Sequence, residues 1–270
     1  MLFRMRTPVS LVGRYGVDGV MRWLVVATAA LVLVASEAEA AEIKVLSAGA
    51  VKPVVPGLGE AFGQETGQTV TFTFDTVGAL RTRASSEPAD VLILSDTAVD
   101  DLVRQRVIVE GTRVDIARVG IGVGVKQGAP LPDISTPNAF KNTLLAAKSL
   151  AYMDPAKGAT SGIYFASVLE RLGIASQVKD KTVLWQSGAS ADAVASGRAE
   201  LCVQQMSEIL PVVGVVVVGP LPKDLQKVTV YSAGLSAKSA NPEVARAFLA
   251  FLARPQFRAK FAAAALDFKE

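Results

Sequence analysis

Small residues and side chains bearing hydroxyl or amide groups gather in five short segments, residues 47–50, 76–78, 157–162, 186–188 and 204–205. Each segment follows a predicted strand. In an open parallel sheet such loops meet at the carboxyl ends of the strands, where backbone amides and helix N-termini favour negative charge. A single loop of this kind is best explained as an ordinary turn. Five at equivalent strand ends predict a binding site for a small anion.

The predicted ligand contacts come from these five segments and from one nearby helix residue. They are Ser47, Ala48, Gly49, Thr76, Val77, Gly78, Arg81, Ser161, Gly162, Ser187, Gly188, Gln204 and Gln205. Gly and Ser let an anion approach backbone amides closely. Gln204 and Gln205 are the strongest candidates, because amides at the end of a buried strand need partners that a ligand can supply. Arg81 and Lys52 are candidates for holding a ligand carboxylate, although such residues are more often solvated surface charges.

The sequence contains no histidine. This excludes Ser-His-Asp and Cys-His catalysis and His-ligated zinc or iron sites. Proton transfer then falls to a carboxylate, lysine, tyrosine or cysteine, and the candidates near the predicted site are Asp75, Glu208, Tyr164 and Lys157. Each also has a purely structural interpretation, respectively as a helix cap, a charge at a helix start, a packing residue and a solvated loop charge. Glycine-rich phosphate-binding motifs are missing, so nucleotide binding is not expected.

Charge and cysteine content narrow the function classes further. Lys and Arg total 28 and Asp and Glu total 25, and removing residues 1–40, with four basic and three acidic residues, leaves 24 against 22. A nearly neutral chain without a basic stripe is not expected to bind nucleic acid. Cys202 is the only cysteine in the sequence, so an intramolecular disulfide cannot form. We expect a monomer with no metal and no cofactor.

The N-terminal 40 residues have the pattern of a secretory signal peptide. Four arginines precede an apolar run over residues 23–34, and Ala38-Glu39-Ala40 provides small residues for cleavage. The run is short for a membrane span. Met21 is an alternative start. We therefore expect export to the periplasm and a mature chain of 230 residues, obtained as 270 − 40.

Strand and helix patterns alternate along the rest of the chain. Strands are predicted over residues 43–46, 70–74, 90–94, 149–153, 183–185, 201–204 and 215–218, the last as a buried strand, with longer extended segments over 116–125 and 227–235. Helices are predicted over residues 53–66, 79–86, 98–106, 137–147, 161–172, 190–196, 242–253 and 255–264. This alternation predicts an α/β fold of mostly parallel sheet flanked by helices.

The two longer extended segments interrupt the alternation and predict two crossovers between two lobes. We place the first lobe at residues 41–121 plus 230–270 and the second at residues 122–229. The ligand cleft is expected between them.

Four segments, residues 43–50, 74–80, 88–91 and 154–164, resemble the periplasmic molybdate-binding proteins of ABC importers. The resemblance implies a type II periplasmic-binding fold, a small anionic ligand and an inner-membrane ABC permease as partner. It also implies that the anion is held by two serine hydroxyls and a tyrosine. The matching positions in this sequence are Ala50, Val77 and Gln205. Because these hydrogen bonds to a desolvated dianion are lost, carboxylates are expected to bind better than molybdate.

Residues 129–136, 204–211 and 219–222 are similar to a branch of the same fold, the periplasmic aconitate isomerases. That likeness implies an organic polycarboxylate ligand and, as an alternative function, an allylic proton shift between trans- and cis-aconitate. The primary expectation is the solute-binding component of an importer. A receptor that presents its bound solute to a sensor fits the same features.

Overall fold

The computed structural model describes residues 41–269, which belong to one compact unit. The predicted signal peptide, residues 1–40, lies outside the described residues. Between residues 41 and 269, no helix combines the length and the apolar character that crossing a membrane requires.

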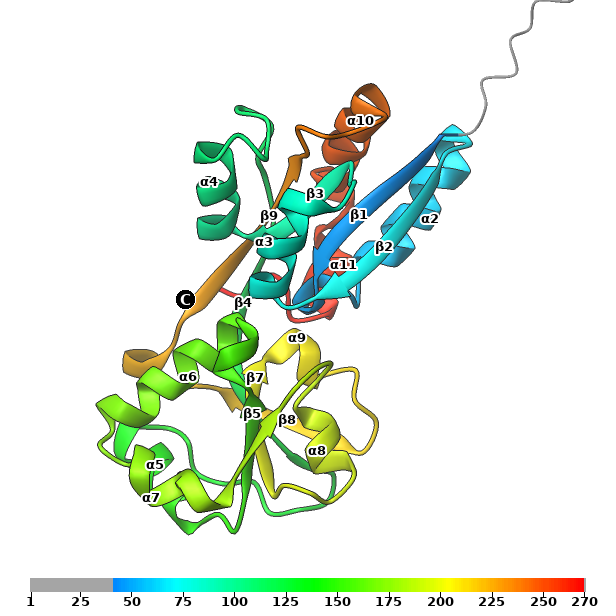
Figure 1. Ribbon diagram of the computed structural model, residues 1–270. Helices are drawn as coiled ribbons and strands as arrows, with labels where there is room; N and C mark the ends of the chain where they lie inside the picture. Colours follow the sequence, from blue (N-terminus) through cyan, green and yellow to red (C-terminus); the bar gives the residue numbers. More distant parts are fainter. Residues whose placement is uncertain (1–40, 270) are drawn as a thin grey trace, which may run out of the picture. The chain divides into compact units, whose positions relative to one another are not determined.

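The strands in residues 41–269 form a nine-stranded sheet in the order β2-β1-β3-β9-β4-β7-β5-β6, with β8 paired to β4 (Figure 1). The strands are β1 (Glu42–Ala48), β2 (Thr69–Asp75), β3 (Val91–Ser95), β4 (Val114–Lys126), β5 (Leu150–Met153), β6 (Thr182–Trp185), β7 (Leu201–Gln205), β8 (Val215–Pro220) and β9 (Val228–Leu235). β1 is parallel to β2 and β3, and β5 is parallel to β6 and β7. The α/β fold is confirmed, and every antiparallel pair involves β4 or β9, the two long extended segments of the sequence.

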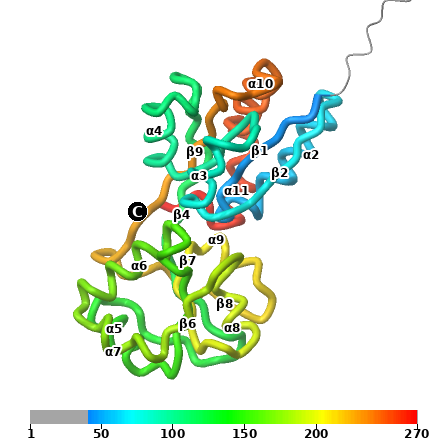
Figure 2. Tube along the Cα trace, in the orientation of Figure 1, coloured from blue at the N-terminus to red at the C-terminus, as the bar shows by residue number. Residues whose placement is uncertain are grey.

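β4 changes partner halfway along its length. Residues 114–120 pair with β9, and residues 121–125 pair with β7. At the change, the side chain of Gln226 continues the ladder: its Oε1 accepts from the Ile121 backbone N at 2.9 Å, and its Nε2 donates to the Ile121 carbonyl at 2.9 Å. Figure 2 shows the chain passing between the two groups of elements at β4 and β9. The two crossovers are therefore a continuous, hydrogen-bonded ribbon.

Helices cover both groups of strands. They are α2 (Val55–Thr66), α3 (Val77–Ser86), α4 (Asp96–Arg104), α5 (Pro137–Ala146), α6 (Thr160–Arg171), α7 (Ala175–Val178), α8 (Ala191–Ala195), α9 (Met206–Ile209), α10 (Pro242–Leu252) and α11 (Arg258–Ala263). α3 packs on β1 and β3, and α4 packs on β3 and β9, while α6 and α8 pack on β5 and β7. Short 3-10 turns complete the described chain: η1 (Gly49–Val51), η2 (Pro155–Lys157), η3 (Lys179–Lys181), η4 (Lys223–Leu225) and η5 (Pro255–Phe257).

Buried apolar residues fall into separate clusters. The first core is drawn from residues 43–119 and 231–266, with Phe62, Phe72 and Phe248 in edge-to-face contact. The second core is drawn from residues 121–225, and a smaller cluster around Cys202 lies beside it. The lobe boundaries predicted above stay a prediction.

Four elements differ from the sequence-based expectation in their start, their presence or their burial. α3 begins at Val77 rather than at residue 79, because the Thr76 side chain accepts from the Ala79 amide and caps the helix. The short helices α7 and α9 were not predicted. The valine run at residues 215–218 was expected to be a buried strand, but β8 pairs with β4 alone and is half-exposed from Val216 onward, so that prediction was wrong. A run of valines looks the same at a sheet edge as in its centre.

A buried carboxylate ties β1, β3 and the segment before α10 together. Asp90 is 3% exposed and accepts from the Lys44 amide at 2.9 Å, the Ser239 hydroxyl at 2.6 Å and the Asn241 amide at 3.1 Å. We expect Asp90→Ala to lower the free energy of unfolding by about 2–4 kcal/mol, because buried donors lose their acceptor. Urea denaturation measures this.

Asp133 provides the matched control, since it accepts from the amide and hydroxyl of Ser135 but is exposed. Asp133→Ala should cost much less, because water replaces the lost acceptor. Equal losses in the two variants would contradict the assigned role of Asp90.

Candidate functional site

A cavity of about 870 Å³ lies where the loops after β1, β2, β5, β6 and β7 converge. Its lining residues come both from the part of the chain that forms the first core and from the part that forms the second. The lining residues predicted from the sequence are Ala48, Gly49, Asp75, Thr76, Val77, Ser161, Ser187, Gly188, Gln204, Gln205 and Glu208, together with Lys52. The volume is typical of sites for small organic ligands.

Three predicted residues lie away from the cavity and have other partners. The hydroxyl of Ser47 is buried and donates to the Ala48 carbonyl. Arg81 forms an ion pair with Asp101 at 2.9 Å. The Tyr164 hydroxyl donates to the Leu225 carbonyl at 3.2 Å. These side chains stabilise the elements around the cavity instead of lining it.

The start of α6 brings unpaired donors to the cavity. Its N-cap is Ala159, whose side chain offers no acceptor, so the first amides of this 12-residue helix have no capping partner from that residue. Ser161 is 1% exposed and lines the cavity, and its Oγ forms no hydrogen bond within residues 41–269. Gly162 does not line the cavity; a Cβ there would lie 2.0 Å from the Met153 carbonyl oxygen, so glycine lets α6 approach β5. The helix dipole and the free hydroxyl both favour an anionic ligand.

Gln204 and Gln205 lie at the end of β7, buried in the site. Gln204 Oε1 accepts from the amide and hydroxyl of Ser190 at 2.6 and 2.8 Å. Its Nε2 meets no acceptor within hydrogen-bond distance in the described chain, yet it is close enough to Glu208 to lower the pKa of that carboxyl. Gln205 Nε2 donates to the Tyr231 hydroxyl at 3.0 Å. Both amides are therefore fixed by partners on neighbouring elements.

Glu208 and Tyr231 are the two titratable groups with perturbed pKa values in the lining. Burial raises the pKa of Glu208 to about 7, and the amide of Gln204 acts in the opposite direction. Burial also raises the pKa of Tyr231, with a further contribution from the Glu208 charge, while hydrogen bonds from Thr160 and Gln205 act against the shift. Tyr231 is consequently a neutral hydrogen-bond donor at physiological pH, whereas Glu208 exchanges a proton there.

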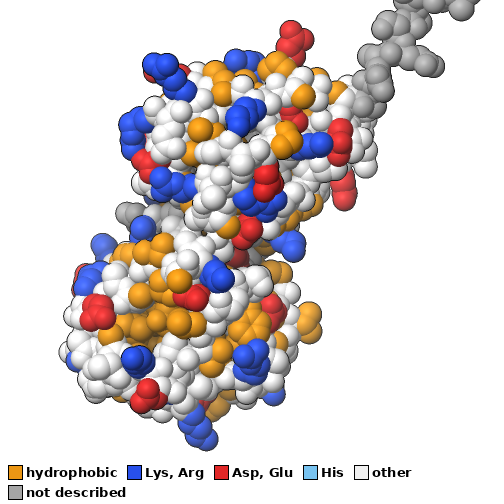
Figure 3. All heavy atoms as spheres, in the orientation of Figure 1, with side chains coloured by type: hydrophobic (Ala, Val, Ile, Leu, Met, Phe, Trp, Pro, Cys, Tyr) orange, Lys and Arg blue, Asp and Glu red, His pale blue; other side chains and the backbone are white. Residues whose placement is uncertain are grey.

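The remaining charges in the lining lie toward the rim. Asp75 is 3.5 Å from the Arg83 guanidinium, and Asp192 is an exposed residue of α8. Lys52 is the lining residue with a cationic side chain, and its ammonium lies 5.6 Å from the centre of the Phe74 ring. Figure 3 shows basic and acidic side chains mixed over the face drawn. The cavity lining therefore combines many apolar side chains with a smaller number of hydrogen-bonding groups, and Lys52 supplies its cationic side chain.

Neither a metal-binding cluster nor a reactive thiol is found at the site among residues 41–269. Within residues 41–269, no group of three His, Cys, Asp or Glu side chains is placed to hold a metal ion. Burial raises the pKa of the Cys202 thiol to about 12. Cys202 packs in the small apolar cluster next to β7 and is not a nucleophile in this environment.

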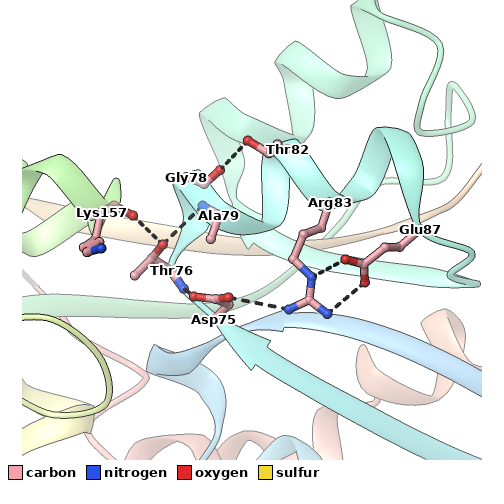
Figure 4. Close-up of polar contacts among 8 residues, drawn as sticks. All are labelled: Asp75, Thr76, Gly78, Ala79, Thr82, Arg83, Glu87 and Lys157. Carbon is pink, nitrogen blue, oxygen red and sulfur yellow. Dashed lines mark hydrogen bonds and ion pairs between the residues drawn. The ribbon is translucent and has the colours of Figure 1, made fainter.

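Residues 76–78 contact residues 157–158 next to the cavity, and Figure 4 shows the bond from the Thr76 side chain to Lys157. Thr76 Oγ1 donates to the Lys157 carbonyl at 2.5 Å, and the Gly78 amide donates to the Gly158 carbonyl at 3.0 Å. A Cβ on Gly78 would lie 2.7 Å from the Cα of Gly158, so only glycine allows this approach. Lys157, a predicted acid or base, takes part through its carbonyl, and neither it nor Gly78 lines the cavity.

Several lining residues were not predicted. They are Ala50, Pro53, Phe74, Met153, Ala159, Thr160, Ala189, Asp192, Ala195, Pro211, Val212, Val213 and Tyr231. Thr160 lies within a segment whose polar residues already indicated a site. Tyr231 lies inside the extended run of β9, where its sequence context shows only strand periodicity.

Comparison with known proteins places these features in a wider group. Residues 43–264 match the bacterial extracellular solute-binding proteins. Aconitate isomerase from a Pseudomonas species is 37% identical over 218 residues, which cover 78% of this chain and 82% of that protein.

Solved structures share the fold at low sequence identity. The periplasmic molybdate-binding protein of Azotobacter vinelandii superposes with a TM-score of 0.71 at 20% identity. The match covers 84% of this chain and 100% of that protein. The sulfate-binding protein of Mycobacterium tuberculosis superposes with a TM-score of 0.68 at 16% identity, covering 84% of this chain and 86% of its own.

The glycine contact leads to a prediction about closure. We expect Gly78→Ala to separate residues 76–78 from residues 157–158, because the new Cβ collides with Gly158. Small-angle X-ray scattering should show a larger radius of gyration than the wild type. Thermal stability should be retained, since alanine is a better helix former than glycine by about 1 kcal/mol.

Gly57→Ala is the control, because Gly57 is also in the first turn of a helix but a Cβ there meets nothing within 4 Å. It should leave the scattering curve unchanged. The closure argument fails if both variants scatter like the wild type.

Proposed function

Because this chain belongs to the bacterial extracellular solute-binding protein family, we propose that it binds a small organic polycarboxylate anion in the cavity at the start of α6. The observation that carries this proposal is the unpaired, buried Ser161 hydroxyl beside the helix N-terminus. A buried donor without an acceptor is costly, and a ligand carboxylate provides the missing acceptor.

Further donors surround the same space. Tyr231 is neutral and has its hydroxyl proton free to point elsewhere, because the oxygen accepts from Gln205. Lys52 places a cation at the rim. One end of a polycarboxylate would meet the α6 amides and Ser161, and another would reach toward Lys52.

The lining argues against a tetrahedral oxyanion as the preferred ligand. Ala50 and Val77 present methyl groups where the resemblance to molybdate-binding proteins implies serine hydroxyls. A compact dianion surrounded by these side chains would lack partners for several of its oxygens. A longer polycarboxylate spreads its charge over separate carboxylate groups and can contact the apolar side chains with its carbon atoms.

The role that follows from binding is transport. We place the protein in the periplasm, where it would deliver its bound anion to an inner-membrane ABC permease. Presentation of the bound anion to a sensor is the alternative use of the same site, and neighbouring permease and ATPase genes would favour import.

A second candidate function is isomerisation of the bound anion, as in the aconitate isomerase relative. The specific observation that favours it is a carboxyl inside the cavity, Glu208, with a pKa of about 7. A group that titrates near physiological pH can both accept and return a proton.

Ligand binding is tested by thermal unfolding in the presence of trans-aconitate, citrate, molybdate, tungstate, sulfate and, as a cationic control, thiamine. We expect the carboxylates to stabilise the protein more than the oxyanions at equal concentration; a ligand present at 100 times its Kd stabilises the protein by about 2.7 kcal/mol relative to the free protein. Thiamine should not stabilise it.

Ser161→Ala should weaken carboxylate binding by roughly 10-fold, the equivalent of about 1.4 kcal/mol for one lost hydrogen bond to a charged group. Ser167→Ala is the matched control, because the Ser167 hydroxyl donates to the Tyr164 carbonyl in an exposed part of the same helix. Stabilisation by no anion, or by molybdate above all carboxylates, would overturn the proposal.

A further inference from the structure

We propose that Glu208 is the catalytic base of an allylic proton shift in a bound tricarboxylate, and that the Tyr231 hydroxyl donates a hydrogen bond to the substrate during that shift. This inference rests on the second candidate function above and assigns the groups that would perform it. It is argued from the positions of both side chains in the cavity and from the partners that each one has.

The structure separates Glu208 from the other candidate bases. The Tyr164 hydroxyl is bonded to the Leu225 carbonyl outside the cavity, and Lys157 contributes only a carbonyl to the cavity edge. Asp75 accepts from the Thr76 amide at 2.7 Å and lies 3.5 Å from the Arg83 guanidinium, so its side chain is held in place by structural partners. Glu208 lines the cavity, and no salt bridge to it is found within residues 41–269.

Glu208 is directed inward by the helix that carries it. α9 follows β7 without a loop, and it contacts η1 and β4. A Cβ on Gly49 would lie 3.0 Å from Glu208 Oε1, so the carboxyl rests against the backbone of η1. The Glu208 carboxyl is thereby held between elements that belong to both cores, and the Gln204 side chain lies close to it.

Tyr231 lies across from α9 on β9. It is 2% exposed, and its oxygen accepts from Gln205 Nε2 at 3.0 Å. Since that lone pair is occupied, the hydroxyl proton is available to an acceptor in the cavity. Burial raises the pKa of Tyr231, which keeps this proton in place at physiological pH.

The chemistry balances without a cofactor. The Glu208 carboxylate removes a proton from the methylene carbon of trans-aconitate, breaking one C–H bond. The electron pair spreads over the three-carbon allyl unit and its carboxylates, where Tyr231, Ser161 and the α6 amides stabilise the added charge. Protonated Glu208 then returns the proton to the former vinyl carbon, which forms one C–H bond and moves the double bond by one carbon to give cis-aconitate.

The charged and titratable groups that line the cavity around Glu208 are Lys52 after η1, Asp75 on β2, Asp192 on α8 and Tyr231 on β9; the lining residues of β7 are the neutral Gln204 and Gln205. A base must be deprotonated, so kcat/KM should rise with pH through about 7 and be lost below it. The negative charge of the bound substrate disfavours ionisation of Glu208. The midpoint of the pH dependence of kcat should therefore lie at a higher pH than that of kcat/KM.

The experiment mixes purified protein with trans-aconitate and follows cis-aconitate by chromatography across pH. Glu208→Gln should lower kcat at least ~100-fold, the scale of general base catalysis, while thermal stabilisation by trans-aconitate persists. Glu208→Asp should recover part of the activity. Tyr231→Phe should lower kcat on the order of 100-fold with little change in KM, because its hydrogen bond is needed in the transition state.

Tyr164→Phe is the control, since that hydroxyl lies outside the cavity, and it should retain wild-type turnover and pH dependence. Turnover that survives Glu208→Gln, or a wild-type protein that binds trans-aconitate without converting it, would overturn this inference and leave the binding function intact. Failure of every carboxylate to bind would refute the proposed function itself.

Discussion

The pairing of β4 with β9 is the constraint on which the site depends. β9 pairs with residues 114–120 of β4, and β4 then continues into the sheet around the second core. Gln226 bonds both backbone groups of Ile121 at the point where the partners change. This continuous ribbon sets the register of Tyr231 opposite Ala117, and so its position beside Gln205. Loops from the two cores can converge on one cavity because the strands between them stay paired.

Desolvation decides what the cavity can do chemically. Ser161 is buried in the lining of the cavity, and burial there also raises the pKa values of Glu208 and Tyr231. Hydrogen bonds to a charged ligand are stronger in such a medium, and an unpaired carboxylate is less stable. An anion can therefore be held by neutral donors and a helix end, which leaves the nearby acid free to carry a proton.

Local rules explain what the sequence could predict. The α/β alternation, the helix caps and the small polar loops are set by neighbours along the chain, and the loops at residues 48–49, 76–77 and 187–188 do line the cavity. Residues whose role depends on distant contacts were not predictable in this way. Tyr231 shows only strand periodicity, and the contact of Gly78 with Gly158 joins positions 80 residues apart in sequence. Arg81 was placed near the ligand by helix spacing, but Asp101 on α4 offers a closer partner.

Closure links solute binding to proton chemistry on this fold. The Thr76 hydroxyl donates to the Lys157 carbonyl and the Gly78 amide donates to the Gly158 carbonyl, so these bonds join residues 76–78 to residues 157–158. Thr76, which makes the first of these bonds, and Glu208 both line the cavity. Burial of a carboxyl in such a cavity raises its pKa, because the charged form loses its solvation by water. A binding protein with a desolvated carboxyl such as Glu208 in its cavity therefore already has one physical requirement for an isomerase, a proton acceptor that titrates near physiological pH.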